Sequence, residues 1–182
     1  MKFCKVSWTE LEKDCFALAK KLKGYKIDRI LCISRGGLVW SRMLSDLLGN
    51  LPISHLTVES YQDLKQQKET KITELPQKDF KNETILVVDE IADQGKTFRT
   101  VINYLNSLKI KKFYTLSPYI KSHTSPLPDF YLKKINAWVI FPYEIRETYE
   151  AFIKIFGEGK AKKEMMKVGF INKEINSLLD LH

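Results

Sequence analysis

The sequence predicts an α/β protein with an open, mainly parallel, twisted sheet that is flanked by helices and followed by extra C-terminal helices. Short apolar runs recur along the chain, and each is followed by a polar or glycine-containing loop. In two places the loop leads into residues at helical spacing. Such strand–loop–helix units are typical of parallel sheets, whose loops meet at the carboxyl edge of the strands.

Length and composition indicate one globular domain, residues 1–182, with a full core. Charged residues make up 29% and hydrophobic ones 44%, and no apolar run approaches the roughly 20 residues that span a bilayer. The first residues do not resemble a secretory signal, so we expect a cytoplasmic protein without a membrane partner. Cys4, Cys15 and Cys32 are far apart and odd in number, which favours plain thiols.

The net charge of +8 indicates polyanionic ligands. Nucleic acid is one candidate, and a substrate that carries several phosphates is another. The lysines are spread along the chain, without an arginine-rich tract or a reading-helix motif. We therefore interpret most of them as solvated surface and expect no nucleic-acid partner.

The first half of the chain predicts a helix and then a strand–loop–helix unit. Thr9 and Glu12 have the spacing of a capping box, and helical periodicity follows as far as Gly24. Residues 30–33 form an apolar run that predicts a buried strand. A loop, Ser34-Arg35-Gly36-Gly37, then leads into a helix that Gly49 closes.

The central stretch, residues 84–97, predicts a second unit of this kind. The apolar run Ile85–Val88 reads as a strand buried on both faces, and it ends at the adjacent acids Asp89 and Glu90. Asp93 then opens a tight turn, after which an amphipathic helix begins near Thr97. The acids therefore lie where the sheet ends.

The turn of this unit has the features of a phosphate site. Backbone N–H groups at a glycine turn and at a helix start point outward, and Gly95 lets a ligand come close. Lys96 and the hydroxyl of Thr97 add a charge and a donor. Asp89 and Glu90 suit sugar hydroxyls or Mg²⁺, which takes oxygen ligands and bridges to phosphates. Together these residues predict a site for a phosphorylated sugar.

The second half of the chain predicts further strands and a helical tail. Residues 53–60 read as a strand, while residues 61–79 are polar and lack a clear period, as in a functional lid or a surface loop. Another strand is expected at 113–117 and a loop with Lys121 at 118–128. A last strand is expected at 137–141, and helices at 144–156, 160–168 and 173–181.

The stretch from Ile85 to Thr97 resembles the binding motif for phosphoribosyl pyrophosphate (PRPP) of type I phosphoribosyltransferases. The usual motif has four apolar residues, two acids, two apolar residues and then Asp-Thr-Gly-x-Thr. This chain departs at Glu90, where the family has Asp, and at Gln94, where it has Thr. The resemblance covers about residues 30–142.

Other segments also resemble this family. Ser34, Arg35, Gly36 and Gly37 are similar to its pyrophosphate loop, in the form found in bacterial and archaeal 6-oxopurine enzymes. Ser60 and Tyr61 resemble the start of the loop that closes over its active site. Three further residues match its base pocket: Lys121 for the purine 6-oxygen, Val139 for the base face and the main chain at Trp138 for the base edge.

The resemblance implies the type I phosphoribosyltransferase fold and transfer of phosphoribose from PRPP to N9 of a 6-oxopurine in purine salvage. PRPP and a purine base would be the partners, Mg²⁺ the cofactor, and a dimer or tetramer the assembly. Asp93 would be the general base. The 5-phosphate and ribose would be held by Asp89, Glu90, Asp93, Gln94, Gly95, Lys96 and Thr97, with Mg²⁺ at Asp89 and Glu90.

Several alternatives stay open at this point. The chain could be a non-catalytic sensor of PRPP or a nucleotide that kept the fold and binds nucleic acid through its basic surface. Lys121 could be merely solvated, and for the Trp138 side chain a buried core position is the favoured interpretation. The helical tail either covers a sheet or builds a subunit contact.

Overall fold

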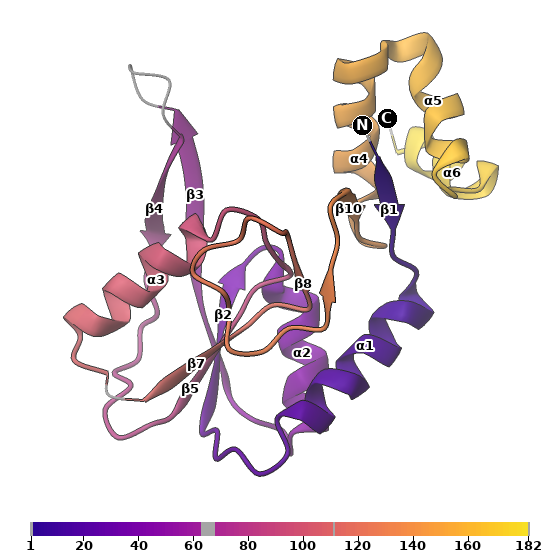
Figure 1. Ribbon diagram of the computed structural model, residues 1–182. Helices are drawn as coiled ribbons and strands as arrows, with labels where there is room; N and C mark the ends of the chain where they lie inside the picture. Colours follow the sequence, from indigo (N-terminus) through magenta and orange to yellow (C-terminus); the bar gives the residue numbers. More distant parts are fainter. Residues whose placement is uncertain (1, 63–67, 111, 182) are drawn as a thin grey trace. The chain divides into compact units, whose positions relative to one another are not determined.

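The computed structural model describes residues 2–62, 68–110 and 112–181. The chain divides into two compact units, one made of residues 12–135 and the other of residues 1–11 and 136–182 (Figure 1). The larger unit contains the main sheet, and the smaller unit contains both ends of the chain. That the whole chain forms one domain stays a prediction.

The main sheet has five strands in the order β4-β3-β2-β5-β7 (Figure 1). Neighbours among β3, β2, β5 and β7 pair in parallel, and β4 is antiparallel to β3. This arrangement confirms the predicted open, mainly parallel sheet. The strands are β2 (Arg29–Ser34), β3 (Ile53–Gln62), β4 (Lys68–Glu74), β5 (Ile85–Val88) and β7 (Phe113–Leu116).

Helices α2 (Gly37–Leu47) and α3 (Lys96–Ser107) cover opposite faces of this sheet. Leu31 packs in one buried cluster with Val101 and Leu105 of α3. The next residue along β2, Cys32, lies beside Ser41 of α2. Because successive strand residues face opposite sides, the sheet is buried on both faces, as the continuous apolar runs predict.

The first helix, α1 (Trp8–Lys21), begins slightly earlier than predicted. The capping box is formed by Ser7 and Glu10: the Glu10 N–H lies 3.2 Å from the Ser7 hydroxyl, and the Ser7 N–H donates to the Glu10 carboxylate at 2.8 Å. The prediction of Thr9 and Glu12 as the capping box is wrong. Both pairs have the required spacing, and the earlier pair satisfies the helix start first.

The polar stretch predicted to lack regular structure contains a strand. β3 extends to Gln62, and β4 pairs with it in an antiparallel arrangement. Val58 lies opposite Ile72, and both are partly buried against the core of the larger unit. A hairpin that buries few side chains shows no apolar alternation in its sequence, because its backbone pairing carries much of the stabilisation.

In the smaller unit, β1 (Phe3–Lys5) pairs in parallel with β10 (Trp138–Ile140). Ile140 is buried in a cluster with Phe152, Met165 and residues of the tail, and the ring of Phe3 lies 4.9 Å from that of Phe152. The tail therefore covers this small sheet. Its three predicted helices are confirmed as α4 (Ile145–Phe156), α5 (Glu158–Lys167) and α6 (Asn172–Leu179).

The three cysteines are free thiols, as predicted. Burial, together with smaller contributions from Asp14 and Glu12, raises the pKa of Cys15 to about 12, so this thiol stays protonated. Burial also raises the pKa of Cys32, and the neighbouring hydroxyls of Ser41 and Ser34 oppose the rise. Within the described residues, no helix is both long and apolar enough to cross a bilayer.

Candidate active site

The segment between β5 and α3 forms the central loop of the site. β5 ends at Val88, the short strand β6 (Ile91–Ala92) follows, and α3 begins at Lys96. Gly95, at the N-cap of α3, has a φ of 76°, and a Cβ atom there would lie 2.3 Å from the carbonyl oxygen of Ser125. Only glycine fits at this position. Gly95 has no side chain that could cap α3, and the first N–H groups of a helix find no partner within the helix itself.

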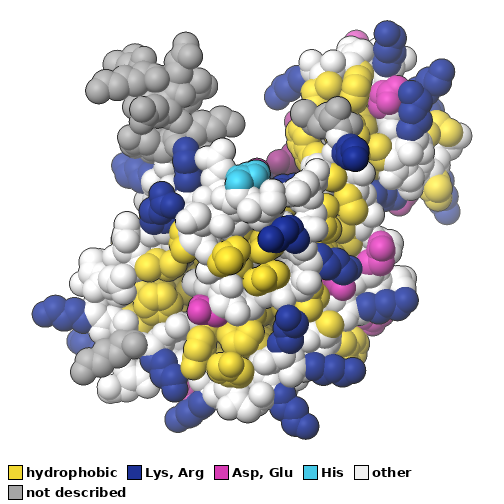
Figure 2. Space-filling model, viewed as in Figure 1, with side chains coloured by type: hydrophobic (Ala, Val, Ile, Leu, Met, Phe, Trp, Pro, Cys, Tyr) yellow, Lys and Arg dark blue, Asp and Glu magenta, His cyan; other side chains and the backbone are white. Residues whose placement is uncertain are grey.

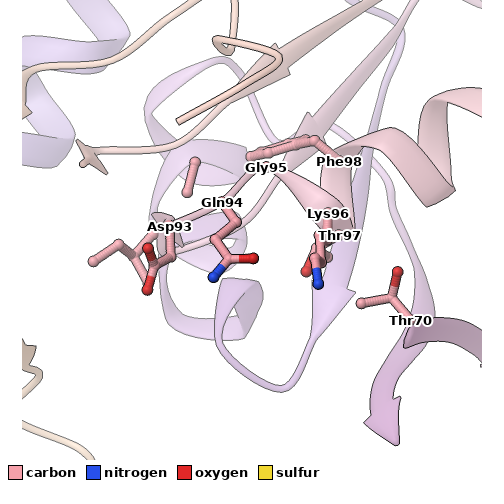
Figure 3. Close-up of a pocket in the computed structure, with 9 residues that line it drawn as sticks. Thr70, Asp93, Gln94, Gly95, Lys96, Thr97 and Phe98 are labelled. Carbon is pink, nitrogen blue, oxygen red and sulfur yellow. The ribbon is translucent and has the colours of Figure 1, made fainter. Parts of the chain in front are cut away.

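A cavity of about 400 Å³ lies along this loop and is lined by Thr70 and residues 91–98. Figure 3 shows Asp93 and Gln94 on the loop, Thr97 in the first turn of α3 and Thr70 on the neighbouring strand, β4. The hydroxyl of Thr70 is 2.6 Å from that of Thr100, so β4 is held against α3. Outward N–H groups and the positive end of the helix dipole favour an anion here, as the sequence predicts.

Asp89 and Glu90 follow β5 directly. Asp89 is buried, and its carboxylate accepts a hydrogen bond from the N–H of Glu90 at 3.0 Å. Burial raises the pKa of Asp89, and hydrogen bonding with the Glu90 side chain and N–H opposes the rise. A nearby cation would favour the ionised form of such a buried carboxyl.

The glycine loop after β2 packs directly against this acidic pair. A Cβ atom on Gly36 would lie 1.6 Å from a carboxylate oxygen of Glu90, and one on Gly37 would lie 2.5 Å from the carbonyl oxygen of Val88. Arg35 is exposed, and the peptide bond between Ser34 and Arg35 is cis. The two loops that the sequence places at the carboxyl ends of their strands therefore meet, because β2 and β5 are neighbours.

The residues present fit a magnesium ion. The carboxylates of Asp89 and Glu90 lie next to each other at the end of β5. Mg²⁺ prefers oxygen ligands of this kind, and substrate phosphates and water can complete its coordination. Within the described part of the chain, no group of three or more acidic, histidine or cysteine side chains forms a site that could hold a metal by itself. Asp89 and Glu90 would thus hold the ion together with the substrate.

The loop that follows β8 (Tyr119–Ile120) brings Lys121 next to the central loop. Lys121 is buried, with 9% of its surface exposed, and its N–H donates to the carbonyl oxygen of Ala92 at 3.1 Å. The alternative of a merely solvated lysine is therefore wrong. The same loop carries His123, whose Nε2 lies 2.6 Å from a carboxylate oxygen of Asp93. Nothing in the sequence spacing relates His123 to Asp93, so sequence reasoning missed it.

The remaining predicted site residues belong to other segments of the chain. Val139 is buried in β10 of the smaller unit, whereas the Trp138 side chain is 41% exposed and contacts Phe3, with ring centroids 6.1 Å apart. The interpretation of Trp138 as a buried core residue is therefore wrong, because its side chain points outward from a strand at the edge of a two-stranded sheet. Ser60 and Tyr61 belong to β3, and their side chains lie outside the described part of the structure.

Basic side chains do not gather at one place on the visible surface. Figure 2 shows lysine and arginine spread over this face and separated by uncharged surface. A nucleic-acid interface usually gathers positive charge into a patch or stripe. The view agrees with the interpretation of most lysines as solvated.

We expect Gly95→Ala to destabilise the protein far more than Gly24→Ala. Both glycines have positive φ, of 76° and 90°, but a Cβ atom meets nothing within 4 Å at Gly24. Backbone strain of alanine at a positive φ costs roughly 1–2 kcal/mol, so we expect Gly24→Ala to lower the free energy of unfolding by that amount. Overpacking against Ser125 adds roughly 1–3 kcal/mol for Gly95→Ala. Chemical denaturation of both variants measures the difference, and equal losses would contradict the close approach of the two loops.

The fold and this site define an α/β protein that binds a phosphorylated ligand at the carboxyl ends of parallel strands, beside a pair of carboxylates. The sequence matches the family described as "Phosphoribosyl transferase domain" over residues 7–148. The chain therefore belongs to the phosphoribosyltransferase family and is an enzyme of that kind.

Individual relatives agree with this assignment. The chain is 28% identical over 153 residues to the xanthine-guanine phosphoribosyltransferase of Cereibacter sphaeroides, covering 79% of this chain and 88% of the relative. Among solved structures, the purine phosphoribosyltransferase of Pyrococcus horikoshii has a TM-score of 0.72 at 32% identity, covering 79% and 95% of the two chains. The xanthine-guanine-hypoxanthine phosphoribosyltransferase of Helicobacter pylori has a TM-score of 0.70 at 27% identity, covering 82% and 98%.

Proposed function

We propose that this protein transfers the 5-phosphoribosyl group of PRPP to N9 of a 6-oxopurine and releases pyrophosphate, as a step of purine salvage. Guanine, xanthine and hypoxanthine are the candidate bases. The relatives are purine, xanthine-guanine and xanthine-guanine-hypoxanthine phosphoribosyltransferases by name, which supports this class of acceptor. The observation that carries the proposal is the contact between the glycine loop, at Gly36, and the carboxylate of Glu90.

The contact matters because the reaction needs a ribose site and a pyrophosphate site side by side. The bond between C1 of the ribose and the pyrophosphate oxygen breaks, with its electron pair leaving on pyrophosphate. A bond from N9 of the base to C1 forms, and the proton on N7 passes to a general base. Positive charge develops on the ribose and negative charge on the leaving group, so both must be held in a site that excludes water.

The chain's own residues divide this work. The backbone of residues 94–97 holds the 5-phosphate, with the Thr97 hydroxyl and Lys96 as further donors. Asp89 and Glu90 hold the ribose hydroxyls and would hold Mg²⁺, which neutralises pyrophosphate when bound. Arg35 offers a planar donor fork to pyrophosphate oxygens, and Gly36 and Gly37 let backbone N–H groups approach.

The base is held by other segments. Asp93 accepts the N7 proton, and Lys121 donates to the 6-oxygen. Val139 packs on the base, and the main chain at Trp138 meets its edge. Ser60 and Tyr61 begin the lid that covers the reacting centre. The roles of all six residues rest on the family resemblance.

Pyrophosphate release, measured with PRPP and each of guanine, xanthine, hypoxanthine, adenine and uracil, tests the proposed function. We expect release that needs a 6-oxopurine and that stops when a chelator removes Mg²⁺. A parallel preparation of Asp93→Asn controls for a contaminating host enzyme. Release with adenine or uracil alone would contradict the proposed base. An inert protein that binds PRPP and a specific nucleic acid at physiological salt would favour the non-catalytic sensor instead.

Gln94, which stands where the family motif has Thr, should weaken PRPP binding only modestly. The 5-phosphate is held mainly by backbone N–H groups, and the Gln94 amide can still donate. One neutral hydrogen bond contributes about 0.5–1.5 kcal/mol, so we expect Gln94→Thr to lower the KM for PRPP by at most about tenfold. The kcat should hardly change. Steady-state kinetics check this, and an inert native enzyme that Gln94→Thr restores would contradict it.

A further inference from the structure

The loop formed by residues 121–126 is fastened to the central loop along its backbone. The Thr124 hydroxyl lies 2.6 Å from the carbonyl oxygen of Ala92 and 2.7 Å from that of Asp93, and it accepts a hydrogen bond from the N–H of Lys121 at 2.9 Å. Arg99 of α3 donates to the carbonyl oxygen of Ser125 at 2.9 Å. These contacts fix the backbone on both sides of Asp93, but they do not fix the direction of its side chain.

The side chain of Asp93 is contacted by His123. Its Nε2 is 2.6 Å from Oδ1 of Asp93, and because a carboxylate accepts, Nε2 must carry the hydrogen. The two side chains are 59% and 63% exposed. A pair this exposed contributes little to stability, since water screens it. The contact therefore calls for an explanation other than folding.

We propose that His123 is a positioning residue for Asp93: it holds one carboxylate oxygen so that the other is aimed at the N7 proton of the base. The role rests on the proposed function, in which Asp93 is the general base. A carboxylate with no such contact rotates about two side-chain torsions, and only a narrow range of directions reaches the proton. Holding Oδ1 favours the productive directions of the carboxylate before the base arrives.

The position of His123 in the chain strengthens the argument. It lies two residues after Lys121, which would hold the 6-oxygen, so one loop would position both the base and the group that deprotonates it. Because Thr124 and the N–H of Lys121 bond to residues 92 and 93, a movement of this loop moves both partners together. The backbone segments that carry the 6-oxygen donor and the general base are thereby held together.

His123→Leu, His123→Gln and the control His55→Leu test this role. His55 is an exposed histidine on β3, so the control makes the same substitution away from the site. We expect His123→Leu to lower kcat by about ten- to a hundredfold, as misplacement of a reacting group does, while the KM for PRPP changes less than about threefold. The amide of His123→Gln can still donate to Asp93 and should recover part of the loss. The control should match the wild type.

A double-mutant cycle with Asp93→Asn separates positioning from other effects. If His123 acts through Asp93, His123→Leu should cause no further loss of kcat in the Asp93→Asn background. Equal losses in both backgrounds, or a His123→Leu enzyme with wild-type kcat, would overturn the role of His123 while leaving the proposed function standing. A wild-type protein that transfers no phosphoribose would overturn the proposed function and this role with it.

Discussion

Asp93→Asn should lower kcat by roughly a hundredfold or more, the usual scale for loss of a positioned general base. Asp93 comes directly before residues 94–97, it lines the cavity formed by Thr70 and residues 91–98, and it is exposed. Asparagine has nearly the same shape, and its oxygen can still accept from His123. The substitution therefore removes proton acceptance while it preserves the local structure.

Asp93→Asn should lower turnover without weakening the binding of PRPP. We expect the dissociation constant for PRPP, measured by calorimetry, to change by less than about threefold, because backbone N–H groups carry most of the phosphate binding. Asp46→Asn is a matched control, since Asp46 is an exposed acid on α2. Unchanged turnover in Asp93→Asn would remove Asp93 from the mechanism, and a large loss in the control would show that the assay reports stability.

We expect Lys121 to be the main source of a strong preference for guanine over adenine. Its ammonium group has three donors and no acceptor, so it suits the 6-oxygen of guanine and opposes the 6-amino group of adenine. A buried donor that faces another donor is costly, and sites built to hydrogen-bond a substrate group reject its analogue by roughly 10⁴-fold. We expect the wild type to prefer guanine over adenine in kcat/KM on about this scale.

Lys121→Met tests whether this residue is the source of the preference. Methionine keeps much of the apolar stem but has no ammonium group, so kcat/KM for guanine should fall and the ratio to adenine should shrink by at least about a hundredfold. Lys20→Met, at an exposed lysine of α1, is the control for loss of one positive charge. A wild type that uses adenine as well as guanine would refute the base assignment without touching the fold.

Local sequence determined the elements that build the site. The run Ile85–Val88 is apolar throughout because both faces of β5 are buried, and periodicity of this kind can be read without knowing any partner. Gly95 marks the turn before α3 because its positive φ is a property of the local backbone. The tail helices were predictable for the same reason, since helical spacing is a local signal.

Tertiary structure alone decided which of these parts meet. The pairing of β1 with β10 joins residues more than 130 positions apart, and no local pattern marks Phe3 as the partner of Trp138. The Thr9–Glu12 spacing was as good a capping signal as Ser7–Glu10, and only the folded chain shows which pair bonds. Likewise β4 exists because β3 offers it a backbone edge, and its own polar sequence does not predict it.

The site shows the same division. The sequence predicted Asp93 and the two glycine loops from their places after strand ends, and it predicted Lys121 through the family resemblance. The contact of Gly36 with Glu90 and that of His123 with Asp93 join residues 54 and 30 positions apart. Such contacts depend on strand order and register, which place two loops at one edge of the sheet. Local preferences act over a few residues, so they select the elements, whereas packing of the whole unit selects the neighbours.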